Sequence, residues 1–254
     1  MRVVFLILIS LIPSLAPAQS IGEQALLQLA NESRAQYRLP PLTWDAALAR
    51  AARLHVIRSA RAGGIAEHQY PGEPDLLTRA AQAGAKFSTI SENVAGNATS
   101  AAQIHDAWMH SPAHRSNILD PHVTSVGIAV ALSQPRGQSQ PMLYAVEDFS
   151  RTVDTLGPAD VEVRAQQILL GQGIRSDTTV AAKRDARQAC TSGTASLTQP
   201  SLILQWEGPD LNDLPATVLP QLTNPRKQTV AIGTCATTRA AQGFTTYRIA
   251  VLVY

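Results

Sequence analysis

The chain has 254 residues, of which 45% are hydrophobic and 16% are charged. This length allows one large domain or two small ones, and the composition excludes a disordered chain. The formal net charge of +2 gives no support to nucleic-acid binding.

The first residues, MRVVFLILISLIPSLAPAQS, predict a secretory signal peptide over residues 1–18. Arg2 precedes an apolar run over residues 3–12, and the small-residue pattern Ala-Pro-Ala at 16–18 marks the cleavage point. A retained membrane anchor is disfavoured because the run is too short to cross a bilayer comfortably and Pro13 interrupts it. No later stretch reaches the length of a membrane span. We therefore expect an exported protein, secreted or periplasmic.

Two helices are predicted directly after the signal. The first covers QALLQLANESRAQYRL, whose apolar residues recur with a helical period, and it ends before Pro40. The second covers ALARAARLHVIRSARAGG, with Asp45 just before it and Gly63 and Gly64 as its stop. His55 lies on the apolar face of this second helix. We expect it to be a hydrogen-bonded core histidine rather than a ligand.

The middle of the chain contains two further helices and a hairpin. DLLTRAAQAG predicts a short helix that ends at Gly84, while KFSTISENVAGN is turn-rich and polar around Glu92. The fourth helix opens at Ser100 and runs until Pro112 disrupts it. Beyond it, VTSVGIAVAL and MLYAVEDFS are rich in β-branched residues and are separated by the turn-rich QPRGQSQP. They predict an antiparallel hairpin.

Residues 152–158 look like a domain boundary, marked by a Gly-Pro pair at its end. DVEVRAQQILLGQG and DTTVAAKRDARQAC then have helical periods, and SLILQW, QTVAIGTC and TTYRIAVLVY are strand-like. The two cysteines, Cys190 and Cys235, predict one disulfide in an oxidising compartment, with two buried free thiols as the alternative. We expect a small disulfide-stapled α+β domain of unknown role over residues 153–254. No internal repeat is apparent.

Several motifs over residues 19–152, taken together and in order, resemble a bacterial CAP domain. They are NESR (31–34), PPLTWDAALARAARLH (40–55), EH (67–68), SENVA (91–95), AWMHSPAHRSNIL (107–119), TSVGIAV (124–130) and VEDF (146–149). The CAP superfamily comprises cysteine-rich secretory proteins, antigen 5 and plant pathogenesis-related proteins, and the domain is also called SCP. The resemblance covers about half of the chain and implies an α+β fold, a three-layer α-β-α sandwich. One strand of the family's small antiparallel sheet has no counterpart among the elements predicted above.

The resemblance also implies a central cavity lined by two histidines and one or two acidic residues, able in some members to hold a divalent metal such as zinc. The matching positions here are His68, Glu92 and His114. Neutral imidazoles and a carboxylate suit zinc, with water as a fourth ligand. The only acid between Glu92 and His114 is Asp106, which points away from the core face of its helix. We therefore expect a triad and a weaker metal site than a full tetrad.

HSPAHRSNIL, residues 110–119, carries two histidines four residues apart but does not predict a metalloprotease helix. His110 follows Asp106 by four residues on the outer face, where an exposed pair is expected. Pro112 breaks the helical geometry that would align His110 with His114, and an HExxH motif would need glutamate at position 111. The stretch predicts an outward-facing helix end followed by a turn that presents His114.

Two polar residues follow His114. Asn117 is expected to hydrogen-bond local backbone and hold the turn, and Arg115 to lie partly on the surface, with substrate contact as the alternative for both. Ser91 lacks the glycines of a nucleophile elbow, and neither cysteine lies in this domain. A glycosidase would need a second acid, for which Glu67 is the nearest candidate. Nucleophilic catalysis and glycoside hydrolysis therefore have little support.

Three hypotheses for function remain. The first is a non-enzymatic binding or interaction protein whose cavity holds a small ligand, a lipid or a cell-envelope component, with zinc or another divalent metal as an optional cofactor. The second is a metal-dependent hydrolase in which His68, Glu92 and His114 hold the metal or activate water. In the third, the C-terminal domain carries the biological role and the CAP domain is a scaffold. We favour the first, because no catalytic nucleophile is apparent and the acid set is incomplete.

Overall fold

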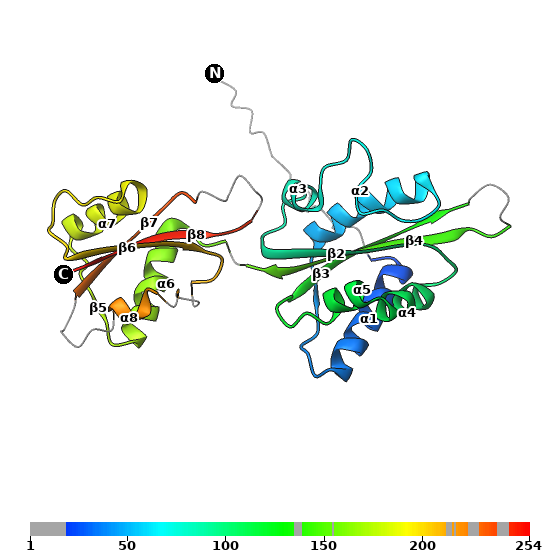
Figure 1. The fold of residues 1–254 in the computed structure, drawn as a ribbon, viewed down its shortest axis with the longest axis horizontal. Coiled ribbons are helices and arrows are strands. Elements are labelled where there is room, and N and C mark those ends of the chain that lie inside the picture. Colours follow the sequence, from blue (N-terminus) through cyan, green and yellow to red (C-terminus); the bar gives the residue numbers. More distant parts are fainter. Residues whose placement is uncertain are drawn as a thin grey trace, which may run out of the picture.

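The structure is a computed structural model that describes residues 19–134, 139–153, 155–211, 215, 217–222, 229–237 and 244–254. The predicted signal peptide lies outside the described residues. Two four-stranded sheets form, with strand orders β1-β3-β4-β2 and β5-β7-β8-β6 (Figure 1). Each sheet packs against its own helices, and the predicted α+β class is confirmed. We call the parts built on the first and second sheets the N-terminal unit and the C-terminal unit.

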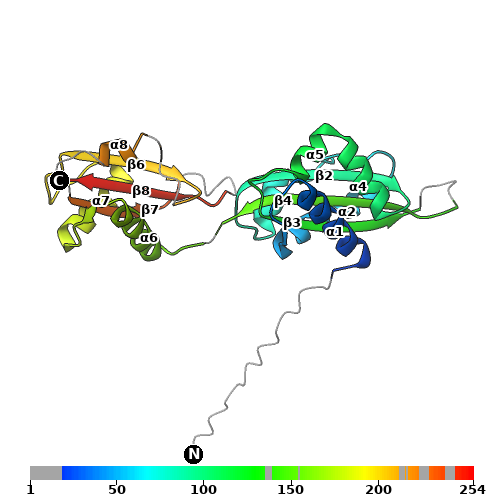
Figure 2. The same ribbon diagram turned by 90° about the horizontal axis from the view of Figure 1, so that it is seen from below.

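The N-terminal unit is a three-layer α-β-α sandwich, as the resemblance implies. Its strands are β1 (Thr43–Trp44), β2 (Phe87–Ala98), β3 (Ser125–Ser133) and β4 (Met142–Thr152). Its helices are α1 (Ile21–Gln36), α2 (Ala46–Ala62), α3 (Leu76–Gln82), α4 (Ala101–His110) and α5 (Pro112–Ile118). Helices α2 and α3 cover one face of the sheet, and α1, α4 and α5 cover the other (Figures 1 and 2).

Alternation along β4 builds both faces. Ala145 and Phe149 pack with α1, α4 and α5, whereas Tyr144 and Val146 pack with α2. Both sets are buried because successive strand side chains point to opposite faces and helices cover each face. The predicted hairpin is also confirmed, since β3 and β4 pair antiparallel along their lengths.

The stretch around Glu92 is a strand rather than the expected polar turn. Strand β2 pairs antiparallel with β4 from Phe87 to Ala98 and lies at the edge of the sheet. The prediction was wrong because the polar side chains in the middle of this stretch find partners on other elements. Their burial is therefore a tertiary effect that local composition does not reveal.

The expected break at Pro112 is confirmed, but a helix follows it instead of a turn. Ser111 has extended backbone angles and separates α4 from α5, and Pro112 occupies the first turn of α5. Proline is tolerated there because the first N–H groups of a helix have no intrahelical partner. His114 is thus presented by a short helix.

The C-terminal unit contains the helices and strands that were predicted, plus two short elements. Its helices are α6 (Pro158–Gly171), α7 (Val180–Ser192) and α8 (Leu219–Leu222), and its strands are β5 (Arg175–Ser176), β6 (Leu202–Gly208), β7 (Thr229–Cys235) and β8 (Tyr247–Val253). The Cys190–Cys235 disulfide joins α7 to β7 and confirms that prediction. Among the described residues, no helix combines the length and hydrophobicity needed to cross a membrane.

The two units repeat one topology, although no repeat is apparent in the sequence. In each, a two-residue strand pairs parallel with the third strand, which pairs antiparallel with the fourth, which pairs antiparallel with the second. In each, the long helix that follows the two-residue strand packs on the sheet, α2 on β3 and α7 on β7. The repeat lies in the backbone path and strand directions rather than in residue identity.

Two details recur at matching places. Arg53 lies eight residues after the N-cap of α2 and pairs with Glu23 of α1 at 2.7 Å; Arg187 lies eight residues after the N-cap of α7 and pairs with Glu162 of α6 at 2.7 Å. A strand glycine also lies against the backbone of the long helix in each unit, Gly127 against α2 and Gly233 against α7.

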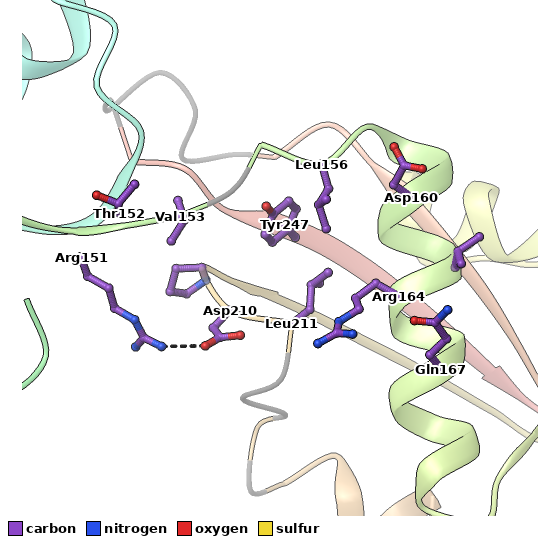
Figure 3. Close-up of a pocket in the computed structure, with 12 residues that line it drawn as sticks. Arg151, Thr152, Val153, Leu156, Asp160, Arg164, Gln167, Asp210, Leu211 and Tyr247 are labelled. Carbon is purple, nitrogen blue, oxygen red and sulfur yellow. Dashed lines mark hydrogen bonds and ion pairs between the residues drawn. The ribbon is translucent and has the colours of Figure 1, made fainter. Parts of the chain in front are cut away.

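The units meet beside the end of β4. Arg151 forms an ion pair of 2.6 Å with Asp210, at one side of a hollow of about 420 Å³ (Figure 3). Phe87 of β2 contacts Phe244 edge-on, and the Thr245 N–H donates to the Phe87 carbonyl at 2.8 Å. Each of these contacts joins a residue before the predicted boundary to a residue after it.

Candidate functional site

The structure brings His68, Glu92 and His114 together at the edge strand β2. His68 comes from the loop after α2, Glu92 from β2 and His114 from α5. Nδ1 of His68 donates to Oε1 of Glu92 at 2.9 Å, and the two imidazole centroids are 6.4 Å apart. Because β2 has a free edge, elements from both helical layers can reach around it and meet there.

Glu92 is held on both of its carboxylate oxygens. Oε1 accepts from His68, and Oε2 accepts from Nη2 of Arg79 on α3. Both Glu92 and Arg79 are buried, so the ion pair compensates a charge that would be costly alone. The carboxylate is therefore oriented by two partners before any ligand arrives.

An amide pair fixes α5 to β2. The Asn117 side chain donates to the Glu92 carbonyl at 3.2 Å and to Oδ1 of Asn93 at 2.9 Å, and Asn93 donates to the His114 carbonyl at 3.1 Å. Asn117 was expected to bond local backbone; its partners instead lie on a strand that the sequence did not predict. Arg115 is exposed, as expected, and packs over the ring of Tyr37.

His55 is the buried, hydrogen-bonded histidine that was predicted. Its Nδ1 lies 2.9 Å from the carboxylate of Glu73, and its Nε2 lies 2.9 Å from the Glu67 carbonyl. Nε2 is also 3.9 Å from Oε2 of Glu92. The side chain of Glu67 was the candidate for a second glycosidase acid. In the structure, Glu67 contacts the buried His55 through its backbone carbonyl.

Asp148 is an acidic residue of this region that the sequence analysis missed. It lies directly opposite Glu92 in the β2–β4 pairing, is fully buried, and has no hydrogen-bond partner in the described part of the chain. Burial and the nearby charge of Glu92 raise the pKa of Asp148 well above its usual range, so its carboxyl holds a proton more readily than an exposed one would. Adjacent acids in an apolar strand were a usable signal, since alternation sends one of them to each face.

The other member of that pair, Glu147, faces α1, α4 and α5. It is fully buried, and neither carboxylate oxygen has a partner among the residues described. Burial raises its pKa well above the usual range. Asp106, by contrast, lies on the surface as expected and pairs with His110 at 3.3 Å.

The pKa values of the two site histidines are shifted in opposite directions. The hydrogen bond to Glu92 raises the pKa of His68, whereas burial, followed by the charge of His68, lowers the pKa of His114. The pKa of His68 is therefore higher than that of His114, so that His68 is the first of the two imidazoles to be protonated as the pH falls. A neutral imidazole offers one donor and one acceptor, while a charged imidazole offers two donors.

Within the described residues, His68, Glu92 and His114 do not form a three-ligand metal site as they are arranged here. Both oxygens of Glu92 are engaged, and Nδ1 of His68 points to that carboxylate. A metal held by all three side chains would have to compete for Glu92, whose two oxygens already accept hydrogen bonds, whereas Nε2 of a neutral His68 keeps its lone pair. Over the described ranges, no three His, Cys, Asp or Glu side chains lie close enough to share a metal ion.

The C-terminal unit repeats the fold but not the site. When the two parallel strand pairs, β1–β3 and β5–β7, are aligned, Val126 corresponds to Val230. In the same alignment Glu92 corresponds to Ile203, and Asp148 corresponds to Leu252. All six histidines of the chain precede residue 123. The acidic and imidazole groups therefore belong to the N-terminal unit alone.

A second histidine contact was also missed by the sequence analysis. Oγ of Ser33 on α1 lies 2.8 Å from Nε2 of His105 on α4. Both residues are buried, and Nδ1 of His105 has no partner within the described segments. Without access or an orienting acid, this pair links two helices rather than forming a nucleophile and base.

Comparison with known proteins places the same residues in one family. The profile of the Cysteine-rich secretory protein family (CAP) matches residues 27–149. The uncharacterized protein YkwD of Bacillus subtilis (strain 168) is 29% identical over 109 residues, which are 43% of this chain and 42% of that protein. The chain therefore matches less than half the length of this curated relative.

Parts of two solved structures are also similar to this chain. An extracellular protein containing a SCP domain from Bacillus anthracis str. Ames has 23% identity and a TM-score of 0.43, over 51% of this chain and 40% of that one. An outer surface protein from Borrelia burgdorferi has 19% identity and a TM-score of 0.44, over 51% of this chain and 91% of that one. The family match and the ordered motifs identify residues 27–149 as a CAP domain of the cysteine-rich secretory protein family.

Proposed function

We propose that this is an exported binding protein whose CAP domain holds a ligand of the cell envelope at His68 and His114 without turning it over. One observation carries the proposal: Glu92, the acid beside the two histidines, is engaged on both oxygens by His68 and Arg79. A general base needs a lone pair within reach of the substrate proton. Glu92 serves better as an anchor for His68 than as a base.

The neighbourhood of the histidines supports binding over hydrolysis. Ser91 precedes Glu92 on β2, so strand alternation sends its side chain to the opposite face of the sheet. Asp148 is close to Glu92 but is buried, and burial raises its pKa well above the usual range. The described residues thus supply positioned hydrogen-bonding groups but no activated nucleophile beside them.

The chemistry of the site also suggests the class of ligand. The side chain of His68 is 61% exposed and has a raised pKa; His114 is part-buried and has a lowered pKa. Together they suit an anionic oxygen next to a polar group, as in the carboxylates and phosphates of cell-wall polymers. Export is supported by the N-terminal pattern and by the disulfide, because disulfides persist in oxidising compartments.

Sedimentation with lipid-extracted bacterial cell-wall fragments tests this proposal. The mature chain, residues 19–254, should co-sediment, and His68→Ala/His114→Ala should lower the bound fraction at least about tenfold, as loss of charge-assisted hydrogen bonds would. His110→Ala is the matched control, because His110 lies close to His114 in sequence but pairs outward with Asp106. Equal binding by the double variant and the control would refute the proposal.

The hydrolase alternative is tested on the same proteins. We expect no turnover of ester, peptide or wall-glycan substrates, with or without added zinc. In calorimetry, the wild type and His68→Ala should show the same response to zinc. Turnover that disappears in His114→Ala would show that the site is catalytic and that our proposal is wrong.

A further inference from the structure

The outward face of α2 combines exposed aliphatic side chains with a ring of arginines. Leu54 is 62% exposed, Ile57 is also exposed, and Ile65 just beyond the helix is 83% exposed. Arg50, Arg53, Arg58 and Arg61 lie on the same helix, and α2 contains no acidic residue. We call these seven residues the α2 patch.

Helix geometry places the patch on one stripe. At 100° per residue, Leu54, Ile57 and Arg61 fall within about 60° of one another, and Arg50 falls between them. Arg53 and Arg58 flank this centre on opposite sides. The aliphatic pair is thus surrounded by guanidinium groups, while the opposite side of α2 packs on the sheet.

The positive charge of the patch is only partly compensated. Arg53 pairs with Glu23 at 2.7 Å, and Arg58 lies 3.9 Å from Glu73, both acids being buried. Arg50 donates to the Ala83 carbonyl at 2.7 Å, which leaves its charge intact. Arg61 is exposed and forms no ion pair in the part of the chain that the structure describes. The face therefore remains cationic.

The repeated fold provides an internal comparison. Helix α7 occupies the place of α2 in the C-terminal unit, and its exposed positions along the middle of the helix are Arg184, Arg187 and Thr191. Val180, at the first position of α7, is exposed, but no aliphatic side chain is exposed from Lys183 to Ser192, although α7 packs on its sheet in the same way. The topology thus does not require Leu54 and Ile57 to face solvent.

We propose that the α2 patch docks on an anionic phospholipid surface, with the aliphatic side chains entering the interface and the arginines binding phosphate groups. Interfacial helices have this combination of basic and apolar residues. Arginine suits phosphate because its planar group donates two parallel hydrogen bonds. A protein partner is less well matched, because protein interfaces are enriched in aromatic residues and the patch has none.

Vesicle sedimentation of the full mature chain tests the proposal. The protein should bind vesicles of phosphatidylcholine mixed with phosphatidylglycerol, should not bind phosphatidylcholine alone, and should dissociate as salt is raised. Leu54→Ser/Arg61→Glu should lower the partition coefficient at least about tenfold. Both side chains are exposed, so the variant should unfold at the wild-type denaturant concentration.

Leu170→Ser/Arg184→Glu is the matched control, since it makes the same exposed changes on α6 and α7. Its binding should equal that of the wild type. The proposal is overturned if the patch variant and the control bind equally, if binding is insensitive to phosphatidylglycerol, or if the wild type does not sediment with either vesicle. Because the patch excludes His68 and His114, failure here leaves the cell-wall proposal standing, and the reverse also holds.

Discussion

Nδ1 of His68 lies 2.9 Å from Oε1 of Glu92, although 24 positions of sequence and the whole of α3 separate the two residues. The contact joins an exposed imidazole to a buried carboxylate that Arg79 holds from the other side. It positions His68 at the edge of the sheet and raises the pKa of its imidazole. The proposed binding of a ligand at His68 and His114 depends on this contact.

Arg34 of the NESR motif should be a major contributor to stability. It is buried, and its guanidinium donates to the carbonyls of Pro40, Ile118, Asp120 and Val123. Arg34→Met would leave these carbonyls without their donor, and we expect the free energy of unfolding to fall by about 3 kcal/mol or more. Urea unfolding measures the change. Arg38→Met, at an exposed neighbour, should stay within about 0.5 kcal/mol of wild type.

Gly127 should not tolerate a side chain. A Cβ there would lie 2.1 Å from the Ala49 nitrogen and 2.2 Å from the Leu48 carbonyl carbon, both backbone atoms of α2. Gly127→Ala would separate α2 from β3, and we expect a loss of about 3 kcal/mol or more in unfolding free energy. Gly171→Ala, where the added Cβ meets no atom within 4 Å, is the control and should change stability by about 1 kcal/mol at most.

Asp185 should make the stability of the C-terminal unit depend on acid. Burial would raise its pKa, but hydrogen bonds from the Thr198 hydroxyl and the N–H groups of Ser196, Leu197 and Thr198 outweigh burial and hold the pKa at about 2. Since the pKa is lowered from 3.8, the stabilisation is present above that pH and is lost as pH falls towards 2.

The measurement is urea unfolding of wild type and Asp185→Asn across this pH range. The variant should be less stable at neutral pH, and the difference should shrink as the wild-type carboxyl protonates. A difference that stays constant down to pH 2 would rule out the carboxylate as its origin.

The disulfide should stabilise the C-terminal unit substantially. It joins residues 45 apart, and loop closure of that length corresponds to about 4 kcal/mol in the chain-entropy model. Cys190→Ala/Cys235→Ala should therefore unfold at much lower urea, and reduction of the wild type should have the same effect. The N-terminal unit, which has no cysteine, should keep its own transition. A double variant as stable as the wild type would contradict this prediction.

The sequence predicted those elements whose ends are set by residues a few positions away in the chain. Asp45 accepts from the N–H groups of Ala47 and Leu48 at the start of α2, and Gly63 with a φ of 68° ends it. Both residue types are preferred at those positions for reasons that act within a few residues. The hairpin and the disulfide followed from equally simple patterns.

What depended on distant partners was not predictable in the same way. Strand β2 was missed because polar residues such as Glu92 and Asn93 are typical of turns. Their hydrogen-bond partners, Arg79 and Asn117, come from other elements that the local sequence does not reveal. Asp148 was missed because the acid was sought between Glu92 and His114 in sequence rather than across the sheet. The repeat was missed because it lies in the strand order and pairing and not in residue identity. At the positions of Glu92 and Asp148, for example, the C-terminal unit has Ile203 and Leu252.

The most direct test of the site is an NMR titration of the His68 and His114 imidazoles in the mature chain and in His68→Ala. We predict a pKa above 6.5 for His68 and below 6.5 for His114, with the pKa of His114 rising towards 6.5 when the side chain of His68 is removed. His68→Ala should fold normally because the side chain is exposed. If both imidazoles titrate at 6.5 and the variant leaves His114 unchanged, then His68, Glu92 and His114 do not form one site.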